Sequence, residues 1–217
     1  NTNMLSDYAA IKNGSYGKLM KAYYAKQDAE KLSGKGDTSQ KLTLMKTSAD
    51  SLKKSADALN DSSLWEKKKI KKKDEKTGED IEIEDYDWDK ITKAVKSFVE
   101  DYNDVVKEAG ESNTKDVLRN ASWMTGMTDK NSNMLAKIGI TIGKGNKLEL
   151  DEDALKQADI SSLKTVFTGY NSFVSKISQK ATGISNAANR ASATYTNNGT
   201  YSKTDSSLTS SKIDKEV

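Results

Sequence analysis

Two short segments of the sequence resemble motifs from the active sites of penicillin-binding proteins. Ser51-Leu52-Lys53-Lys54 has the Ser-x-x-Lys spacing of a serine nucleophile and its lysine, and Lys76-Thr77-Gly78 is a Lys-Thr-Gly triplet. Such sites also need a Ser-x-Asn motif, which is missing between these two segments, and a sheet that brings all three motifs together. We therefore do not expect this pair of segments to be catalytic.

A run of alternating carboxylates begins like a calcium-binding loop, because Asp85, Asp87 and Asp89 match its first, third and fifth positions. The sixth position is Lys90 where an EF-hand needs glycine, and the twelfth is Lys96 where it needs glutamate. An acidic segment that leads into the N-terminus of a helix, where negative charge is favourable, explains these residues better. We expect no calcium site here.

Two further segments have residue types that could form a phosphate site and an acid/base pair. Gly143-Lys144-Gly145 lacks the spacing and the final Lys-Ser/Thr of a phosphate-binding loop, so it is expected to be a turn. The carboxylates of Asp151-Glu152-Asp153 are adjacent at the expected start of a helix, where they point apart and where capping accounts for them. The sequence therefore predicts no catalytic residue, no metal site and no cofactor.

The amino-acid composition excludes the commonest catalytic side chains. The 217 residues include no His and no Cys, so there is no imidazole base, no thiolate nucleophile, no Cys/His zinc site and no disulfide. The formal net charge is +3 with both signs spread along the chain, so charge favours no nucleic-acid partner. No apolar run approaches the roughly 20 residues of a membrane-spanning helix. These features predict a structural or partner-binding protein and not an enzyme.

The elements that would position these residues are mostly helices, because apolar residues recur at steps of three and four. One helix is expected from Tyr16 to about Lys31, a second around Met45 to Leu59, and a third from Trp88 to Gly110. Asn113 is expected to cap a further helix, whose apolar residues are Val117, Leu118, Ala121 and Met124.

The last part of the chain predicts a short helix and then a long one. Asp151 is expected to cap a short helix with Leu155, and Asp159 or Ser161 to cap the long one. The stripe of the long helix consists of Leu163, Val166, Phe167, Tyr170, Val174, Ile177, Ala181, Ile184, Ala188 and Ala191. Because the chain has no proline to interrupt its helices, we predict a mainly α fold, an elongated antiparallel helix bundle with two small β-hairpins.

The two hairpins are expected near residues 64–88 and 138–150. In the first, a lysine-rich run precedes an acid-rich run, so folding back would pair a basic strand with an acidic one; the alternative is a solvated charged loop. In the second, two short alternating runs flank a Gly-Lys-Gly-Asn turn. We predict one helical bundle domain over residues 1–192 that contains both hairpins, followed by a polar tail over residues 193–217.

Seven apolar residues on the third and last helices form a candidate stripe for packing or assembly: Phe98, Tyr102, Val105, Phe167, Tyr170, Val174 and Ile177. Such a stripe either fills the core of the chain or faces a partner helix, and core is the default for any single position. The Tyr and Met residues of the first helix, and the alanine-lined end of the last, are further candidates for contacts between molecules.

Three segments together resemble a known family. The first, Phe98-Val99-Glu100-Asp101-Tyr102-Asn103, has a Phe-Val-x-x-Tyr-Asn pattern. The second is the Leu-x-x-Ile-Gly-Ile run ending at Ile140 with the Leu-x-Leu-Asp run ending at Asp151, and the third is Asp159 to Phe167. In order and spacing they are similar to the C-terminal region of the flagellar filament-capping family, hook-associated protein 2. The family-motif residues are Ile138, Gly139, Ile140, Leu148, Leu150 and Asp151.

The resemblance implies a structural component of the bacterial flagellum, located outside the cell, whose helices from both ends of the sequence pack together. It also implies partners, namely other copies of the chain in a ring that aids flagellin assembly at the filament tip, and other flagellar axial proteins. That family carries large β-domains where this chain has only the segment 64–88. The alternative function is an intracellular helical adaptor that binds a partner helix.

Overall fold

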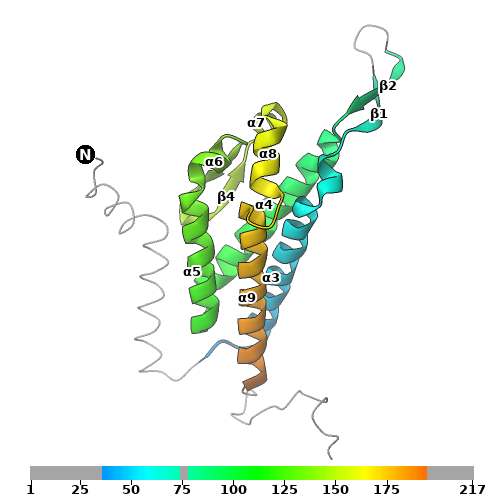
Figure 1. Cartoon of the computed structure of the whole chain (residues 1–217). Coiled ribbons are helices and arrows are strands. Elements are labelled where there is room, and N and C mark those ends of the chain that lie inside the picture. Colours follow the sequence, from blue (N-terminus) through cyan, green and yellow to red (C-terminus); the bar gives the residue numbers. More distant parts are fainter. Residues whose placement is uncertain (1–35, 74–77, 195–217) are drawn as a thin grey trace, which may run out of the picture.

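The computed structural model describes residues 36–73 and 78–194, which form seven α-helices and two two-stranded sheets (Figure 1). This content of helices and strands confirms the prediction of a mainly α fold with two small hairpins. The predicted helix from Tyr16 to Lys31 lies outside the described residues, and so does the predicted tail from residue 195 onward.

Four helices form the body of the structure: α3 (Ser39–Asn60), α4 (Trp88–Gly110), α5 (Lys115–Lys130) and α9 (Phe173–Thr194). Helix α3 packs against α4 and α9, and α5 packs against the same two helices, so the four close into a bundle (Figure 1). Helices α3 and α5 begin at the end of the bundle where α4 and α9 finish. Neighbouring helices are therefore antiparallel, as predicted.

The apolar stripes of the sequence are the buried faces of these helices. On α3 the buried residues are Leu42, Met45, Ala49, Leu52, Ala56 and Leu59, at steps of three and four. Removing such side chains from water stabilises a fold by about 25 cal/mol per Å² of apolar surface, so these stripes hold the bundle together. Side chains also cap the helices, since Thr38 accepts a hydrogen bond at the start of α3 and Asp87 accepts one at the start of α4.

The charged segment forms a hairpin. Strand β1 (Lys68–Lys73) pairs antiparallel with β2 (Asp80–Asp85), in a register that places Lys71 opposite Glu82. Opposite charges at facing positions stabilise an antiparallel pair, so the predicted pairing of a basic with an acidic strand is confirmed. A 3-10 turn, η1 (Ser62–Trp65), leads into this hairpin, which projects beyond one end of the bundle (Figure 1).

The second predicted hairpin is also confirmed. Strand β3 (Ile140–Ile142) pairs antiparallel with β4 (Leu148–Leu150) through the 3-10 turn η2 (Lys144–Asn146). Three short helices surround it: α6 (Ser132–Ala136), α7 (Glu152–Gln157) and α8 (Ile160–Phe167). As predicted, side chains cap two of them, Asp151 at α7 and Asp159 at α8.

The prediction of one unbroken last helix is wrong, because residues 168–172 separate α8 from α9. Gly169 has a φ of 98°, and its N–H donates a 2.8 Å hydrogen bond to the side-chain oxygen of Asn60 at the end of α3. Helix α9 then begins after Ser172, whose hydroxyl accepts a hydrogen bond from the N–H of Ser175. The steps of three and four continue across this turn, so the apolar period alone does not reveal it.

The predicted cap at Asn113 is also wrong. Helix α5 begins at Lys115 after Thr114, and the Thr114 side chain forms no capping bond of its own. The N–H groups of Asn113 and Thr114 are instead bound by the carboxylate of Asp37, which comes from the segment before α3. A tertiary contact therefore replaces the local cap.

Candidate assembly region

The seven residues of the candidate stripe are divided between the core and the surface. Six have no exposed area within the chain: Phe98, Tyr102, Val105, Phe167, Val174 and Ile177. Tyr170 lies in the turn between α8 and α9 and is 84% exposed. Within a single chain, six members of the stripe already pack against the chain's own helices, and Tyr170 alone of the seven is accessible to a partner.

Aromatic side chains of α4 anchor the centre of the bundle. The ring of Phe98 lies 6.3 Å from that of Phe173 at the start of α9, in an edge-to-face arrangement, and 6.3 Å from the ring of Tyr102. The buried hydroxyl of Tyr102 donates a 2.9 Å hydrogen bond to Thr128 of α5. Burial raises the pKa of Tyr102 above its ordinary value, so this hydroxyl stays protonated and serves as a structural donor.

The next residue of the same motif, Asn103, joins α4 to the second hairpin. Its side-chain oxygen accepts a 2.7 Å hydrogen bond from the N–H of Leu148, and its side-chain nitrogen donates a 2.9 Å bond to the carbonyl of Leu148. One amide thus satisfies both backbone groups of the first β4 residue. We call this contact between Asn103 and Leu148 the motif junction, because it joins two of the three segments on which the family resemblance rests.

The family-motif glycine has a steric role beside that junction. Gly139 has a φ of 79°, in the left-handed region, and a Cβ at this position would lie 2.6 Å from the carbonyl oxygen of Asp151. The carbonyl of Gly139 accepts a 2.8 Å hydrogen bond from the N–H of Asp151, so the two ends of the hairpin touch. Ile138 and Ile140, on either side of Gly139, are buried, and Leu148 is buried as well. Leu150 is partly buried. The family-motif residues therefore close the hairpin and attach it to α4.

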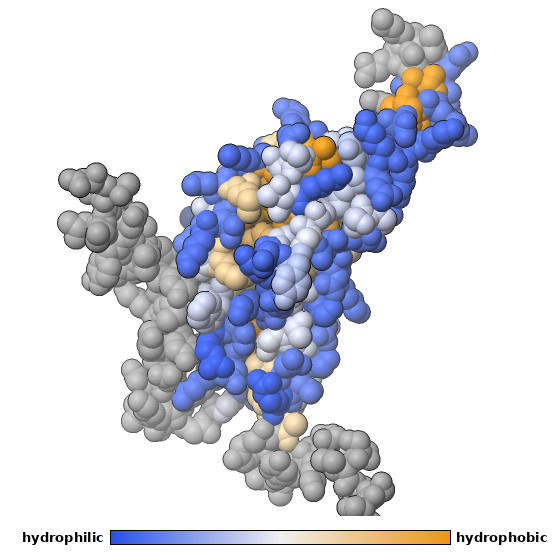
Figure 2. Space-filling model, in the orientation of Figure 1, coloured by the Kyte–Doolittle hydropathy of each residue, from blue (hydrophilic) through white to orange (hydrophobic). Residues whose placement is uncertain are grey.

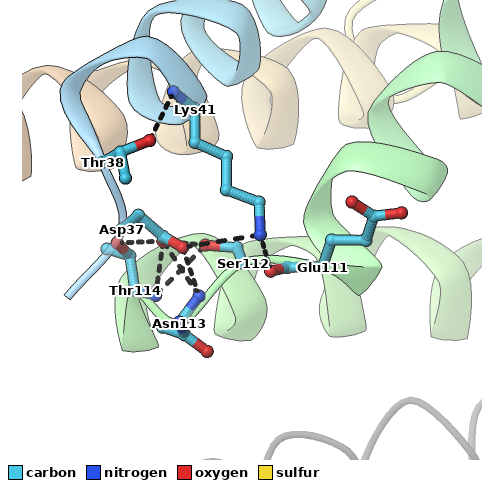
Figure 3. Close-up of polar contacts among 7 residues, drawn as sticks. All are labelled: Asp37, Thr38, Lys41, Glu111, Ser112, Asn113 and Thr114. Carbon is cyan, nitrogen blue, oxygen red and sulfur yellow. Dashed lines mark hydrogen bonds and ion pairs between the residues drawn. The ribbon is translucent and has the colours of Figure 1, made fainter. Parts of the chain in front are cut away.

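A second polar cluster ties the start of α3 to the turn between α4 and α5 (Figure 3). The Asp37 carboxylate, whose side chain is only 1% exposed, accepts hydrogen bonds from the Ser112 hydroxyl at 2.6 Å and the Thr114 hydroxyl at 2.7 Å. It also accepts the N–H groups of Asn113 and Thr114 at 2.8 to 2.9 Å. The ammonium of Lys41 donates to the carbonyl of Glu111 and lies 4.0 Å from Asp37. We call these residues the Asp37 cluster.

The Asp37 cluster favours the ionised carboxylate. Burial raises the pKa of Asp37, but the hydrogen bonds from Ser112, Asn113 and Thr114 lower it by more, so the net pKa lies below the ordinary 3.8. Burial and hydrogen bonding also act in opposite directions on the pKa values of two aspartates where α9 meets α3. The hydroxyl of Ser178 donates to Asp57 and that of Ser185 donates to Asp50, each at 2.7 Å. Burial raises the pKa of each of these aspartates, and hydrogen bonds from lysine and serine lower it by more.

On the face shown in Figure 2 the described residues are mostly hydrophilic, with hydrophobic residues on the β1–β2 hairpin and at several places on the bundle. The large apolar residues that are most exposed are Leu44, Ile81, Trp123 and Tyr170. Among the residues described, no group of three or more Asp or Glu side chains is arranged to hold a metal ion. No helix in the described part of the chain is long and apolar enough to cross a membrane.

Sequence reasoning does not find two contacts that shape this region. Asn103 belongs to a recognisable motif, but its bond to Leu148 joins residues 45 positions apart and has no local sequence signal. Asp37 follows a glycine in a segment typical of a loop, although it binds residues 75 to 77 positions away. For Asp37 no local signal is available, because the residues from Ser112 to Thr114 are themselves of types that cap helices.

Comparison with known proteins finds a matching family model for the C-terminal part of the chain. Residues 112–216 match the family model described as flagellar hook-associated protein 2 C-terminus. This range contains the second hairpin, α8 and α9, whereas the Phe-Val-x-x-Tyr-Asn segment of α4 lies just before it. No curated protein and no solved structure matches the chain significantly. The match supports the assignment of this C-terminal region of the chain to the flagellar hook-associated protein 2 family.

Proposed function

We propose that this chain is a non-enzymatic structural protein that assembles with itself and with flagellar axial proteins on the outside of the bacterial cell. The observation that carries the proposal is the family match over residues 112–216. Two contacts of the bundle fit such a role, because the motif junction and the Asp37 cluster fix the hairpin and the helix ends against one another.

Capping of the filament tip is the specific form of this role that the family resemblance suggests. A cap is a ring of copies, so the chain must associate with itself. The six buried stripe residues are occupied within one bundle, so the contacts between copies must use other surfaces. The exposed apolar residues and the charged hairpin are the available ones among the described residues.

The proposal is tested by locating the chain in flagellated cells that produce it with an epitope tag. Filaments are sheared from the cells, and the tagged chain is measured by immunoblot in the filament fraction, the medium and the cell lysate. Enrichment in the filament fraction, at a fixed ratio to flagellin, supports the proposal. A chain confined to the lysate, bound there to a helical partner, would favour the intracellular adaptor instead.

A further inference from the structure

An exposed tryptophan lies on the outer side of α5, next to α9. Trp123 is 61% exposed, and the ammonium of Lys180 from α9 lies 5.4 Å from the centre of its ring. Arg119 lies one turn before Trp123 on the same side of α5, and its side chain is exposed. Tryptophan and arginine are among the residues that contribute most to binding between proteins. We call Arg119, Trp123 and Lys180 the tryptophan surface.

A second surface, on α4, carries a concentration of negative charge. Residues 100–111, which end one residue after α4, include five Asp or Glu residues and one lysine. Glu100 and Asp104 are exposed and lie one turn apart, and Asp101 lies beside them. No ion pair within the described part of the chain neutralises these three carboxylates. We call Glu100, Asp101 and Asp104 the acidic surface.

The carboxylates of the acidic surface repel one another. Burial raises the pKa of Asp101 above its ordinary value, and the charges of Asp104 and Glu100 raise it further, against the effect of a hydrogen bond with Ser55 of α3. A cation brought to this surface by another molecule would relieve the repulsion. The acidic surface is therefore suited to a basic partner.

The two surfaces lie on opposite sides of the bundle. The tryptophan surface belongs to α5 and α9, whereas the acidic surface lies on α4 where this helix meets α3. Helices α4 and α9 are each packed between α3 and α5, so the pair α5 and α9 forms one side of the bundle and the pair α3 and α4 the other. In Figure 1, α5 and α9 lie in front of α3 and α4.

The two surfaces also lie at about the same height along the bundle. Trp123 meets the α9 lysine that comes two residues after Ser178. Ser178 donates a hydrogen bond to Asp57 of α3, two residues after Ser55, and Ser55 binds Asp101 of α4. Because α3 and α9 are antiparallel, these two steps of about 3 Å each cancel. Trp123 and Asp101 are therefore level with each other on opposite sides.

We propose that the tryptophan surface of one copy of this chain binds the acidic surface of the next, with the two bundles side by side and pointing the same way. The inference rests on the proposed self-assembly and names the two surfaces that perform it. A second copy fits because each chain carries both surfaces, opposite in charge and level in height. Contact between two tryptophan surfaces would oppose cations, and contact between two acidic surfaces would oppose carboxylates, which is repulsive in both cases.

This arrangement places α5 of one copy against α4 of the next, because α4 and α5 are neighbours in each bundle. The indole N–H of Trp123 then faces Glu100 and Asp101 of the next copy, whose carboxylates accept hydrogen bonds. Toward the end where α5 begins and α4 finishes, Arg119 reaches the height of Asp104. An arginine and a carboxylate form two parallel hydrogen bonds, so this pair orients the two copies.

The extent and symmetry of the contact follow from the same heights. Toward the other end of the bundle, Lys130 of α5 would face Lys93 of α4, so the contact is limited to the half in which α5 begins. The contact is heterologous, because it joins two different surfaces. Since the surfaces are level, successive copies need no shift along the bundle. A heterologous contact without such a shift closes into a ring when the rotation between copies divides a full turn.

The test measures self-association of the full chain by sedimentation velocity over a range of concentrations. Arg119→Glu and Asp104→Lys each oppose like charges in the contact, and Trp123→Ser removes the ring. Each variant alone is expected to associate at least about tenfold more weakly than the wild type. The matched control, Lys147→Glu, reverses an exposed charge outside both surfaces and should leave association within about twofold of the wild type. Circular dichroism of each variant checks that the helices are retained.

An equal mixture of Arg119→Glu and Asp104→Lys separates the contact between copies from damage to a single chain. In the mixture, the reversed charge at position 119 of one variant meets the reversed charge at position 104 of the other, so this contact is again attractive. The alternate contact joins the two unchanged surfaces. Association of the mixture should return to within about threefold of the wild type. A mixture as weak as either variant alone would overturn the inference.

Two further outcomes separate this inference from the proposed self-assembly. A wild-type chain that associates no more strongly than the three contact variants would overturn the inference and leave the proposed self-assembly intact. A wild-type chain that stays monomeric at all concentrations would contradict both.

Discussion

At the scale of single residues, the most specific contacts are hydrogen bonds between polar side chains and backbone groups. Asn103 and Asp37 each bind backbone groups that are far away in the sequence. An unpaired backbone group that is buried costs free energy, whereas a bonded one costs little. These two residues therefore fix where the second hairpin and α5 lie.

Replacing Asn103 with Leu should lower the free energy of unfolding by about 1 to 3 kcal/mol, because it removes both bonds to Leu148. Urea denaturation followed by circular dichroism measures the loss, and amide exchange at Leu148 should become faster. The matched control is Asn186→Ala at an exposed position of α9, which should change stability by less than about 0.5 kcal/mol. Equal effects of the two substitutions would show that the motif junction is not a stabilising contact.

Replacing Asp37 with Ala should cost about 1 to 3 kcal/mol near neutral pH and progressively less in acid. The pKa of Asp37 in the folded state is below the ordinary 3.8. The contribution of its carboxylate is therefore fully present above the ordinary pKa and is lost as pH falls through the folded-state value. The measurement is the difference in unfolding free energy between wild type and variant from pH 6 down to pH 3. A difference that stays constant over this range would contradict the role of the ionised carboxylate.

At the scale of elements, the helix faces follow from the sequence while the turns between them do not. The stripes of α3 and α4 match their buried residues, because a period of three and four places side chains on one face. The break between α8 and α9 depends on Gly169 and its bond to Asn60, which is a contact between distant segments. The start of α5 likewise depends on Asp37. Local patterns thus predict which residues are buried, and tertiary hydrogen bonds decide where helices end.

The candidate stripe gives a test at this scale. Ile177→Ala should lower the free energy of unfolding by about 2 to 5 kcal/mol, because it removes buried methyl groups from the core. Tyr170→Ala, at the exposed position of the same stripe, should leave stability within about 0.5 kcal/mol of the wild type. Thermal and urea unfolding of both variants measure the contrast. A stable Ile177→Ala variant would contradict the assignment of this residue to the core.

The charged hairpin gives a second test of elements. Among the described strands, β1 and β2 pair only with each other. Removal of residues 68–85 should therefore change the free energy of unfolding of the bundle, measured by urea denaturation, by less than about 1 kcal/mol. A large loss of stability would mean that the hairpin supports the bundle and is not an appendage.

At the scale of the whole molecule, fold class and family were predictable from the sequence, and the surfaces for assembly were not. The helical period predicted the bundle, and the ordered motifs around Tyr102, Gly139 and Asp151 predicted the flagellar family. Most of those motif residues pack within the chain, so their pattern reports how this chain folds. The surface residues that remain for contacts, such as Tyr170 and Ile81, follow the same periods as buried residues, so the sequence does not distinguish them from the core.

The central claim is that this chain is an assembled part of the flagellum, and immunogold electron microscopy of intact filaments tests it most directly. Cells that produce the tagged chain are labelled before and after the filaments are sheared. The account predicts gold particles on filaments, concentrated at the distal tip if the chain serves as a cap. Filaments without label, from cells whose lysate contains the tagged chain in abundance, would contradict it.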